Sequence, residues 1–418
     1  MQRIITRKDF LRLAAAVGGS ALIGVSLTGC DAADRMLLHR QTVTDHAGRT
    51  LEVPTIEDIH SIFFTSGLAQ VYITALCPEL LGGSASKYTE EDLQFMPEGV
   101  ENLPYMGTLH NNDEIDREAL LVEDIDIMFS ISGVGLTQQD ISEADEIEEQ
   151  TGIPVVCVDG TFDKIGDAFR FLGQVLDREE RAEELALYCE GIWEEVHAVV
   201  QTIPESERIR LYYAEGPEGL QTEPETSQHM TAFLEAGAID VALCEETYGG
   251  GMTDVSLEQV LKWDPAVIVA WDSELRGGAV EDIRTNPDWS TIQAVKDGRV
   301  YPMPNLPWAW CDRPPGVNRL MGLQWICNLL YPQYYDIDIV ERAQQFFQVM
   351  LKVDVDRQLI IDMLDNSYNP AQDTPADRVD GESVSDLQEK GVEADLAGEG
   401  GPDSGDVEVD AAAESVEE

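Results

Sequence analysis

The stretch 164–202 most constrains the fold, because it indicates a short helix, a break and then a long helix. In the long part, apolar residues recur at spacings of three and four, which predicts one buried stripe on a helix. These residues are Leu185, Tyr188, Ile192, Val196 and Val199. Asp177 followed by Glu180 resembles a capping box at its start, and Pro204 ends it. Two interpretations follow: a rigid rod between two lobes that enclose a cleft, or a surface helix within one large domain.

The length and the charge of the chain limit its class. Its 418 residues exceed what one compact core usually holds, which favours two domains. The formal net charge of −53 argues against nucleic-acid binding. Such a surface also disfavours a freely diffusing anionic ligand unless a local basic pocket overrides the field. Adaptation to salt is an alternative explanation of the acidity.

The seven cysteines and six histidines do not indicate a metal site. No CxxC occurs, no Cys/His group has zinc-ligand spacing, and the histidines form no cluster. We therefore expect no bound metal and no cofactor. Four cysteines lie in apolar runs and are expected to be buried thiols. They are Cys77, Cys157, Cys189 and Cys327.

Residues 1–30 have the pattern of an export signal. Basic residues precede an apolar run at 13–27, which is too short to span a membrane as a mature helix. The run ends in LTGC at Cys30, which resembles a bacterial lipobox. The flank TRKDFLRL resembles a twin-arginine signal with lysine in the second position, so the general secretory route stays open. We expect export and a lipid on Cys30 that anchors the chain to the outer face of the cytoplasmic membrane, periplasmic or cell-surface. A buried N-terminal helix is the alternative.

Strand and helix signals alternate on both sides of the stretch 164–202, which predicts an α/β fold with parallel sheets. After a hairpin at 43–54, strands are expected at 60–64, 124–130 and within IPVVCVD, and later at 209–214, 267–271 and 299–302. The segment 115–130 aligns with 255–270 at a constant offset of 140 residues. Each reads as a helical turn that leads into a strand, which favours two lobes built alike.

The loop PNLPWAWCDRPPGVNR, 304–319, holds the most unusual group of candidate ligand contacts. Trp308 and Trp310 offer flat apolar faces for a conjugated or macrocyclic ligand, and packing under the loop is the alternative. Arg313 offers a bidentate fork for a carboxylate, phosphate or oxyanion. A salt bridge from Arg313 to Asp312 or to another carboxylate is the alternative.

Further candidates lie where strands end or helices begin. Ser66 is expected to cap a helix whose amides would face a ligand, although a plain cap fits equally. Tyr212 and Tyr213 end a strand near Glu215, so alternate residues could reach the cleft. Three further candidates lie in loops: His110, Tyr248 and Arg276. For His110, a surface or capping role is the alternative.

The chain resembles the helical-backbone class of ABC-transporter substrate-binding proteins, which carry iron–siderophore, haem and cobalamin. The resemblance covers about 43–366 and rests on the lipobox and on the order of four segments: VTDHAGRTLEVP, VSLEQVLKWDPAVIVAW, AVKDGRVYPMP and PPGVNRLMGLQWICNLLYP. It implies two α/β lobes joined by one rigid helix, with the ligand between them. It also implies that Glu118 and Glu258, one per lobe, pair with arginines of a membrane permease. Helix-start glutamates favoured by the helix dipole are the alternative.

The expected organisation follows from these signals. The divisions are a signal peptide at 1–30, a linker at 31–42, an N-terminal lobe at 43–162, a connecting helix at 163–203, a C-terminal lobe at 204–333, a C-terminal helix at 334–366 and a disordered acidic tail at 367–418. We expect a monomeric extracytoplasmic lipoprotein that captures a metal chelate for an ABC permease and catalyses no reaction. An oxyanion such as molybdate or tungstate is the alternative ligand, and an enzyme of related two-lobed fold or a receptor without a permease is the remote alternative.

Overall fold

The computed structural model describes residues 39–108, 115–245, 252–271, 279–364 and 367, all within one compact unit. The predicted signal peptide, Cys30 and nearly all of the predicted acidic tail lie outside the described residues. The chain begins with a hairpin of β1 (Arg40–Thr44) and antiparallel β2 (Thr50–Pro54), as predicted. Strand β1 starts inside the segment that the sequence suggested as a linker.

The first lobe is built on a parallel sheet in the order β3-β4-β5. Its strands are β3 (Ile62–Phe64), β4 (Ile127–Ser132) and β5 (Val155–Asp159). Its helices are α3 (Gly67–Leu76), α4 (Glu90–Leu93), α5 (Arg117–Val122) and α6 (Gln138–Thr151). Helix α3 packs on β3 and β4, and α6 packs on β4 and β5. Short 3-10 turns lie at Ile56–Asp58, Pro78–Leu80 and Val100–Asn102.

The second lobe is built on a parallel sheet in the order β11-β10-β6-β8. Its strands are β6 (Arg210–Ala214), β8 (Ile239–Asp240), β10 (Val267–Ala270) and β11 (Val300–Pro302). Strands β7 (Gln221–Thr222) and β9 (Thr253–Asp254) form a separate antiparallel pair. Its helices are α9 (Thr231–Glu235), α10 (Leu257–Trp263), α11 (Val280–Thr285) and α12 (Gln293–Lys296). Short 3-10 turns lie at Glu205–Glu207, Gln228–Met230 and Pro287–Trp289.

The stretch that organises the sequence forms α7 (Ile165–Leu176), preceded by a 3-10 turn at Phe162–Lys164, and α8 (Glu179–Val200). The predicted apolar stripe of α8 faces the core, with Leu185, Ile192 and Val196 fully buried. The predicted capping box is wrong, because Arg178 is the N-cap of α8 and its side chain makes no capping hydrogen bond. Asp177 instead ends α7 in the left-handed conformation, with φ of 52°. This sharp reversal lets α7 and α8 pack against each other as a tight pair.

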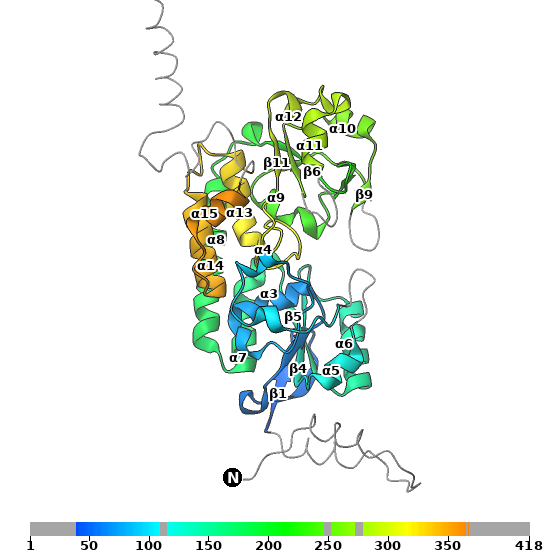
Figure 1. The fold of residues 1–418 in the computed structure, drawn as a ribbon, viewed down its shortest axis with the longest axis vertical. Helices are drawn as coiled ribbons and strands as arrows, with labels where there is room; N and C mark the ends of the chain where they lie inside the picture. Colours follow the sequence, from blue (N-terminus) through cyan, green and yellow to red (C-terminus); the bar gives the residue numbers. More distant parts are fainter. Residues whose placement is uncertain (1–38, 109–114, 246–251, 272–278, 365–366, 368–418) are drawn as a thin grey trace, which may run out of the picture. The chain divides into compact units, whose positions relative to one another are not determined.

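Helix α8 also packs against α13 (Arg319–Leu330) and α14 (Ile339–Leu351), as Figure 1 shows. Every residue of α13 is buried. The sequence suggested one helical region at 337–363, but the structure divides it into α14 and α15 (Arg357–Met363). Lys352 makes the division because it ends α14 with φ of 56°.

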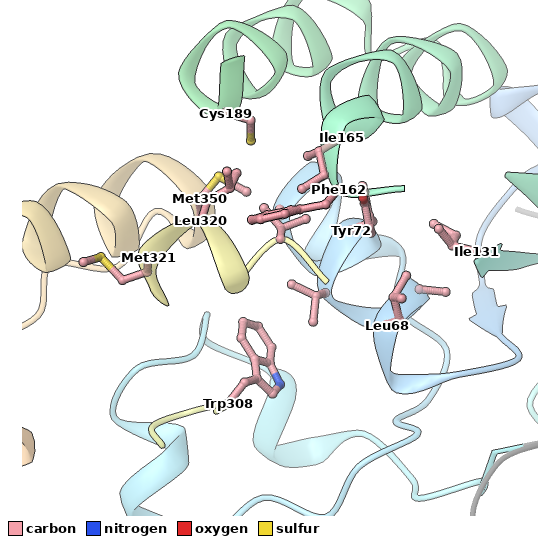
Figure 2. Packing of buried hydrophobic residues seen from close by; sticks show 14 of the residues in the cluster. Leu68, Tyr72, Ile131, Phe162, Ile165, Cys189, Trp308, Leu320, Met321 and Met350 are labelled. Carbon is pink, nitrogen blue, oxygen red and sulfur yellow. The ribbon is translucent and has the colours of Figure 1, made fainter. Parts of the chain in front are cut away.

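Two hydrophobic clusters form the core, and strand β6 contributes to both. Tyr213 belongs to the larger cluster, which includes the first sheet, α7, α8 and α13, whereas Tyr212 belongs to a smaller cluster inside the second lobe. Successive residues of a strand point to opposite faces of a sheet, which explains this separation. Figure 2 shows part of the larger cluster, including Trp308, Leu320 and Phe162. The fold is therefore α/β, with two lobes that each contain a parallel sheet.

Candidate ligand-binding site

The loop that follows β11 meets the carboxyl end of β6 in a buried group of charged side chains. We call this group the Arg313 cluster. Its members are Tyr213, Glu215, Glu223, His229, Asp312 and Arg313. Loops at the carboxyl ends of parallel strands are where α/β proteins bind their ligands. The cluster is therefore the candidate site that the described residues define best.

Arg313 is the centre of the cluster. Its Nη1 donates to Glu215 Oε1 at 2.6 Å and also contacts Asp312 Oδ2. Its Nη2 donates to Glu223 Oε1 at 3.0 Å. The guanidinium carbon lies 4.5 Å from the centre of the Trp271 ring, within the range of a cation–π contact. The three carboxylates have no exposed surface, whereas 16% of the Arg313 side chain is exposed.

Two further members hold Asp312 in place. Tyr213 donates its hydroxyl to Asp312 Oδ2 at 2.8 Å, and His229 Nδ1 contacts Asp312 Oδ1. The cluster thus contains three carboxyl groups against one guanidinium and one imidazole. Burying this many charges is costly unless they are paired and hydrogen-bonded.

The pKa values of the two glutamates shift in opposite directions, although burial raises both. The pKa of Glu215 is raised to about 7, chiefly by burial, with a smaller contribution from the nearby Glu223 and with Arg313 opposing the rise. The pKa of Glu223 is lowered, because the charge of His229, hydrogen bonds and Arg313 together outweigh the effect of burial. Carboxyl groups that are crowded together cannot all ionise easily, so one of them retains its proton to higher pH.

Several predicted ligand contacts are buried or serve the fold. Trp308 and Trp310 are 7% and 2% exposed, so the structure shows the packing alternative, and their role as ligand contacts stays a prediction. Tyr212 donates its hydroxyl to the Gly219 carbonyl at 2.9 Å inside the smaller core cluster. Ser66 is the N-cap of α3 as predicted, and its hydroxyl accepts from the Ala69 amide.

The structure brings Tyr213 and Arg313 together, and it shows the salt-bridge alternative for Arg313. Three predicted contacts, His110, Tyr248 and Arg276, lie outside the described residues. Their role stays a prediction.

The two candidate docking glutamates occupy equivalent positions in the two lobes. Glu118 lies in the first turn of α5 and Glu258 in the first turn of α10, and both are exposed. Each helix has a side-chain N-cap, Asp116 in α5 and Ser256 in α10. The geometry fits both permease docking and the helix-dipole alternative.

Glu223, His229 and Arg319 were not among the site residues predicted from the sequence. Glu223 and His229 reach the cluster through the fold, and no local motif distinguishes them. Arg319 begins α13 and is fully buried, with hydrogen bonds of 3.3 and 3.4 Å to the carbonyls of Gly316 and Gln228. Its guanidinium lies 4.5 Å from the centre of the Phe162 ring. The GVNR segment could have indicated a polar residue in an otherwise apolar helix.

The part of the chain that the structure describes has no candidate metal site and no candidate membrane-spanning helix. Within it, no three histidine, cysteine or acidic side chains are placed so that they could hold a metal ion. No described helix combines the length and the apolar character that crossing a membrane requires. The cysteines predicted to be buried thiols are buried, with free sulfhydryls.

Comparison with known proteins agrees with this architecture. A family described as periplasmic binding protein matches residues 134–306. An ABC transporter solute-binding protein from Sulfurospirillum deleyianum has a similar structure, with a TM-score of 0.70 and 28% identity over 78% of this chain and 99% of that one. A molybdate-binding protein of Haemophilus influenzae is 25% identical over 272 residues, which cover 60% of this chain and 72% of that protein. An Fe(3+)-citrate-binding protein of Bacillus subtilis is 26% identical over 143 residues, or 34% and 43% of the two chains.

The two parallel sheets joined through α7 and α8 define a two-lobed α/β solute-binding protein. Residues 134–306 match the periplasmic binding protein family, and the whole fold is similar to that of an ABC transporter solute-binding protein. These matches support a role as a solute-binding component of an ABC transporter, and periplasmic binding proteins act outside the cytoplasm. The proteins it resembles are solute-binding proteins rather than enzymes.

Proposed function

We propose that the chain captures a metal chelate with anionic groups and delivers it to an ABC permease. The observation that carries this proposal is Arg313, a partly exposed guanidinium in the loop after β11. A guanidinium fork suits the carboxylates that many chelators carry. The similarity to an Fe(3+)-citrate-binding protein supports the same chemistry.

Among the chelates that the family carries, the structure favours a compact one with carboxylates. Haem and cobalamin are large conjugated ligands that would stack on free aromatic faces. The two tryptophans expected to supply such faces are buried. An iron–siderophore or iron–citrate complex needs fewer aromatic contacts and more cationic ones.

A tetrahedral oxyanion is the second candidate. The specific observation in its favour is the match to the molybdate-binding protein, which extends over 272 residues against 143 for the Fe(3+)-citrate-binding protein. Both candidates would place an anionic oxygen on Arg313. They differ in the size of the ligand.

Delivery requires anchoring and docking. In this proposal a monomer is exported, is lipidated on Cys30, and stays on the outer face of the cytoplasmic membrane. Glu118 and Glu258 then contact arginines of the permease. One carboxylate on each lobe would let the permease hold both lobes at once.

Native mass spectrometry and absorption spectra of the full chain, purified in detergent, test the ligand class. The panel contains ferric citrate, a ferric siderophore, haem, cobalamin, molybdate and tungstate. We expect ferric citrate to bind the wild-type chain, to bind Arg313→Met at least tenfold more weakly, and to bind the control Arg40→Met normally. Arg40 is an exposed arginine on β1, far along the chain from the cluster. Binding of molybdate alone would favour the second candidate, and binding of haem or cobalamin alone would contradict the proposal.

A further inference from the structure

Among the described residues, two carboxyl oxygens of the Arg313 cluster lack a hydrogen-bond partner. Glu215 Oε2 and Glu223 Oε2 are buried, and neither has a hydrogen-bond partner within the described part of the chain. The other oxygen of each glutamate takes a different nitrogen of the same guanidinium, Nη1 for Glu215 and Nη2 for Glu223. A buried carboxylate oxygen without a donor is costly, so this arrangement calls for a proton.

A proton on Glu215 would satisfy both oxygens. The side chain of Glu223 is close enough to Glu215 to raise the pKa of Glu215 further. Protonation also reduces the excess of negative charge, because two carboxylates then face Arg313 and His229. The glutamate that carries the proton is Glu215, since His229 and the Met252 amide favour the ionised form of Glu223.

Within the described residues, the charged and titratable groups that face this pair lie on five segments. They are Tyr212 and Tyr213 on β6, Glu223 after β7, His229 in the 3-10 turn 228–230, Cys244 after β8, and Cys311, Asp312 and Arg313 in the loop after β11. Arg313 is the partner that all three carboxyl groups share. The protonation of Glu215 therefore determines how strongly one Nη1 hydrogen of Arg313 is held.

We propose that Glu215 is a specificity-determining residue that competes with the anionic group of the solute for Arg313, and that protonation of Glu215 relieves this competition. A hydrogen bond to a charged acceptor is roughly twice as strong as one to a neutral acceptor. A solute carboxylate or oxyanion therefore displaces a protonated Glu215 from Arg313, whereas an ionised Glu215 stays bound to Arg313. The inference rests on the proposed function, because it assumes that an anionic solute reaches Arg313.

The proposal predicts that solute binding tightens as the pH falls. With a midpoint near 7, the protonated fraction of Glu215 rises from about 0.1 at pH 8 to about 0.9 at pH 6, and the apparent affinity scales with that fraction. We expect about a tenfold gain in the affinity of the full chain for ferric citrate, or for molybdate, over this range. Glu215→Gln, which imitates the protonated acid, should bind as tightly as the wild type does at pH 6 and should show little pH dependence.

Isothermal titration calorimetry at pH 6, 7 and 8 provides the comparison, with Glu281→Gln as the exposed control. The speciation of the probe changes with pH, so the ratio of the affinities of variant and wild type at each pH is the quantity to compare. A ratio that stays constant would overturn the proposal, and so would a ratio that falls as the pH rises. A ratio that grows about tenfold between pH 6 and pH 8 supports it.

Urea unfolding at pH 5 to 8 separates this inference from the choice of solute. Because the native state would hold a proton that the unfolded state releases, the wild type should lose stability relative to Glu215→Gln between about pH 4.5 and pH 7. The expected change in the unfolding equilibrium is on the order of a hundredfold. If no probe binds any variant, the proposed solute class is wrong. The pH dependence of the free energy of unfolding then tests the inference. The same dependence in the wild type and in Glu215→Gln overturns it, and a wild type that loses stability relative to the variant as the pH rises supports it.

Discussion

Asp124 and Asp264 adopt the same left-handed backbone conformation, with φ of 51° and 45°, and they lie 140 residues apart. Asp124 lies between α5 and β4, and Asp264 lies between α10 and β10. Left-handed residues other than glycine are uncommon, and aspartate is one of the few that tolerate the conformation. The shared offset therefore marks one turn that is used twice, once in each lobe.

Replacing Asp264 separates two contributions of its side chain to stability: a hydrogen bond and the tolerance of the left-handed backbone conformation. Asp264 Oδ1 accepts the Gln293 amide at 2.8 Å, so alanine would lose this hydrogen bond as well as the tolerance of positive φ. We expect Asp264→Ala to lower the free energy of unfolding by about 1–2 kcal/mol. Asp264→Asn should cost less than about 0.5 kcal/mol, because asparagine keeps an acceptor oxygen and tolerates the left-handed region. Urea denaturation measures both variants, with the exposed Asp288→Ala as the control. Equal losses for the alanine and asparagine variants would contradict this explanation.

The sequence predicted the repeated unit because helix, turn and strand are local, and their apolar and polar patterns recur in register. The predicted strands and most helices were confirmed for the same reason. The capping box at Asp177 was wrong, since a helix start and a left-handed helix end can share the same residues. Only the packing of α7 against α8 distinguishes them: a Cβ on Gly173 would lie 2.4 Å from the Ala182 Cβ.

The Gly322 position in α13 tests how closely the helix and the Trp308–Arg313 loop approach each other. A Cβ on Gly322 would lie 2.3 Å from the Trp310 carbonyl oxygen and 2.7 Å from the Cys311 Cα. Because these are backbone atoms, the loop itself would have to move. We expect Gly322→Ala to destabilise the fold by about 1–3 kcal/mol or more and to weaken solute binding.

Gly191 in α8 is the matched control. It is exposed, and a Cβ there would meet no heavy atom within 4 Å. Gly191→Ala should therefore stabilise the chain by about 0.5–1 kcal/mol through helix propensity alone. Thermal unfolding of both variants provides the comparison, and a Gly322→Ala variant as stable as the wild type would disprove the close approach.

The candidate site was less predictable than the fold. Arg313 and Tyr213 could be singled out because one lies in an unusual loop and the other at a strand end. For Arg313, the sequence also indicated the alternative of a salt bridge to Asp312 or another carboxylate. Its partner Glu223 is 90 residues away in sequence, and His229 is 83 residues from Asp312. Contacts over such separations depend on tertiary structure, and no periodicity or motif indicates them.

Asp240 at the end of β8 provides a second pH-dependent contribution to stability. Burial raises its pKa to about 6, although hydrogen bonds from the Ala242 and Val241 amides oppose the rise. The native state then binds a proton that the unfolded state releases, so stability falls as the pH rises from about 4 to about 6. We expect Asp240→Asn to remove this loss and to gain on the order of 1 kcal/mol at pH 7. Urea unfolding at pH 4 to 7 checks the slope, and a variant that follows the wild type at every pH would refute the assignment.

Glu118 and Glu258 allow the docking proposal to be tested separately from solute binding. Both carboxylates are exposed, so their removal should leave folding and solute affinity unchanged. If each pairs with a permease arginine, either single alanine variant should reduce uptake severalfold, and the double variant should abolish it. Glu281→Ala is the matched control, because Glu281 is also exposed in the first turn of a helix of the second lobe. Uptake of the bound probe into cells, or into vesicles with the reconstituted permease, is the measurement. Full uptake by the double variant would favour the helix-dipole alternative, in which the two glutamates stabilise only the helices they begin.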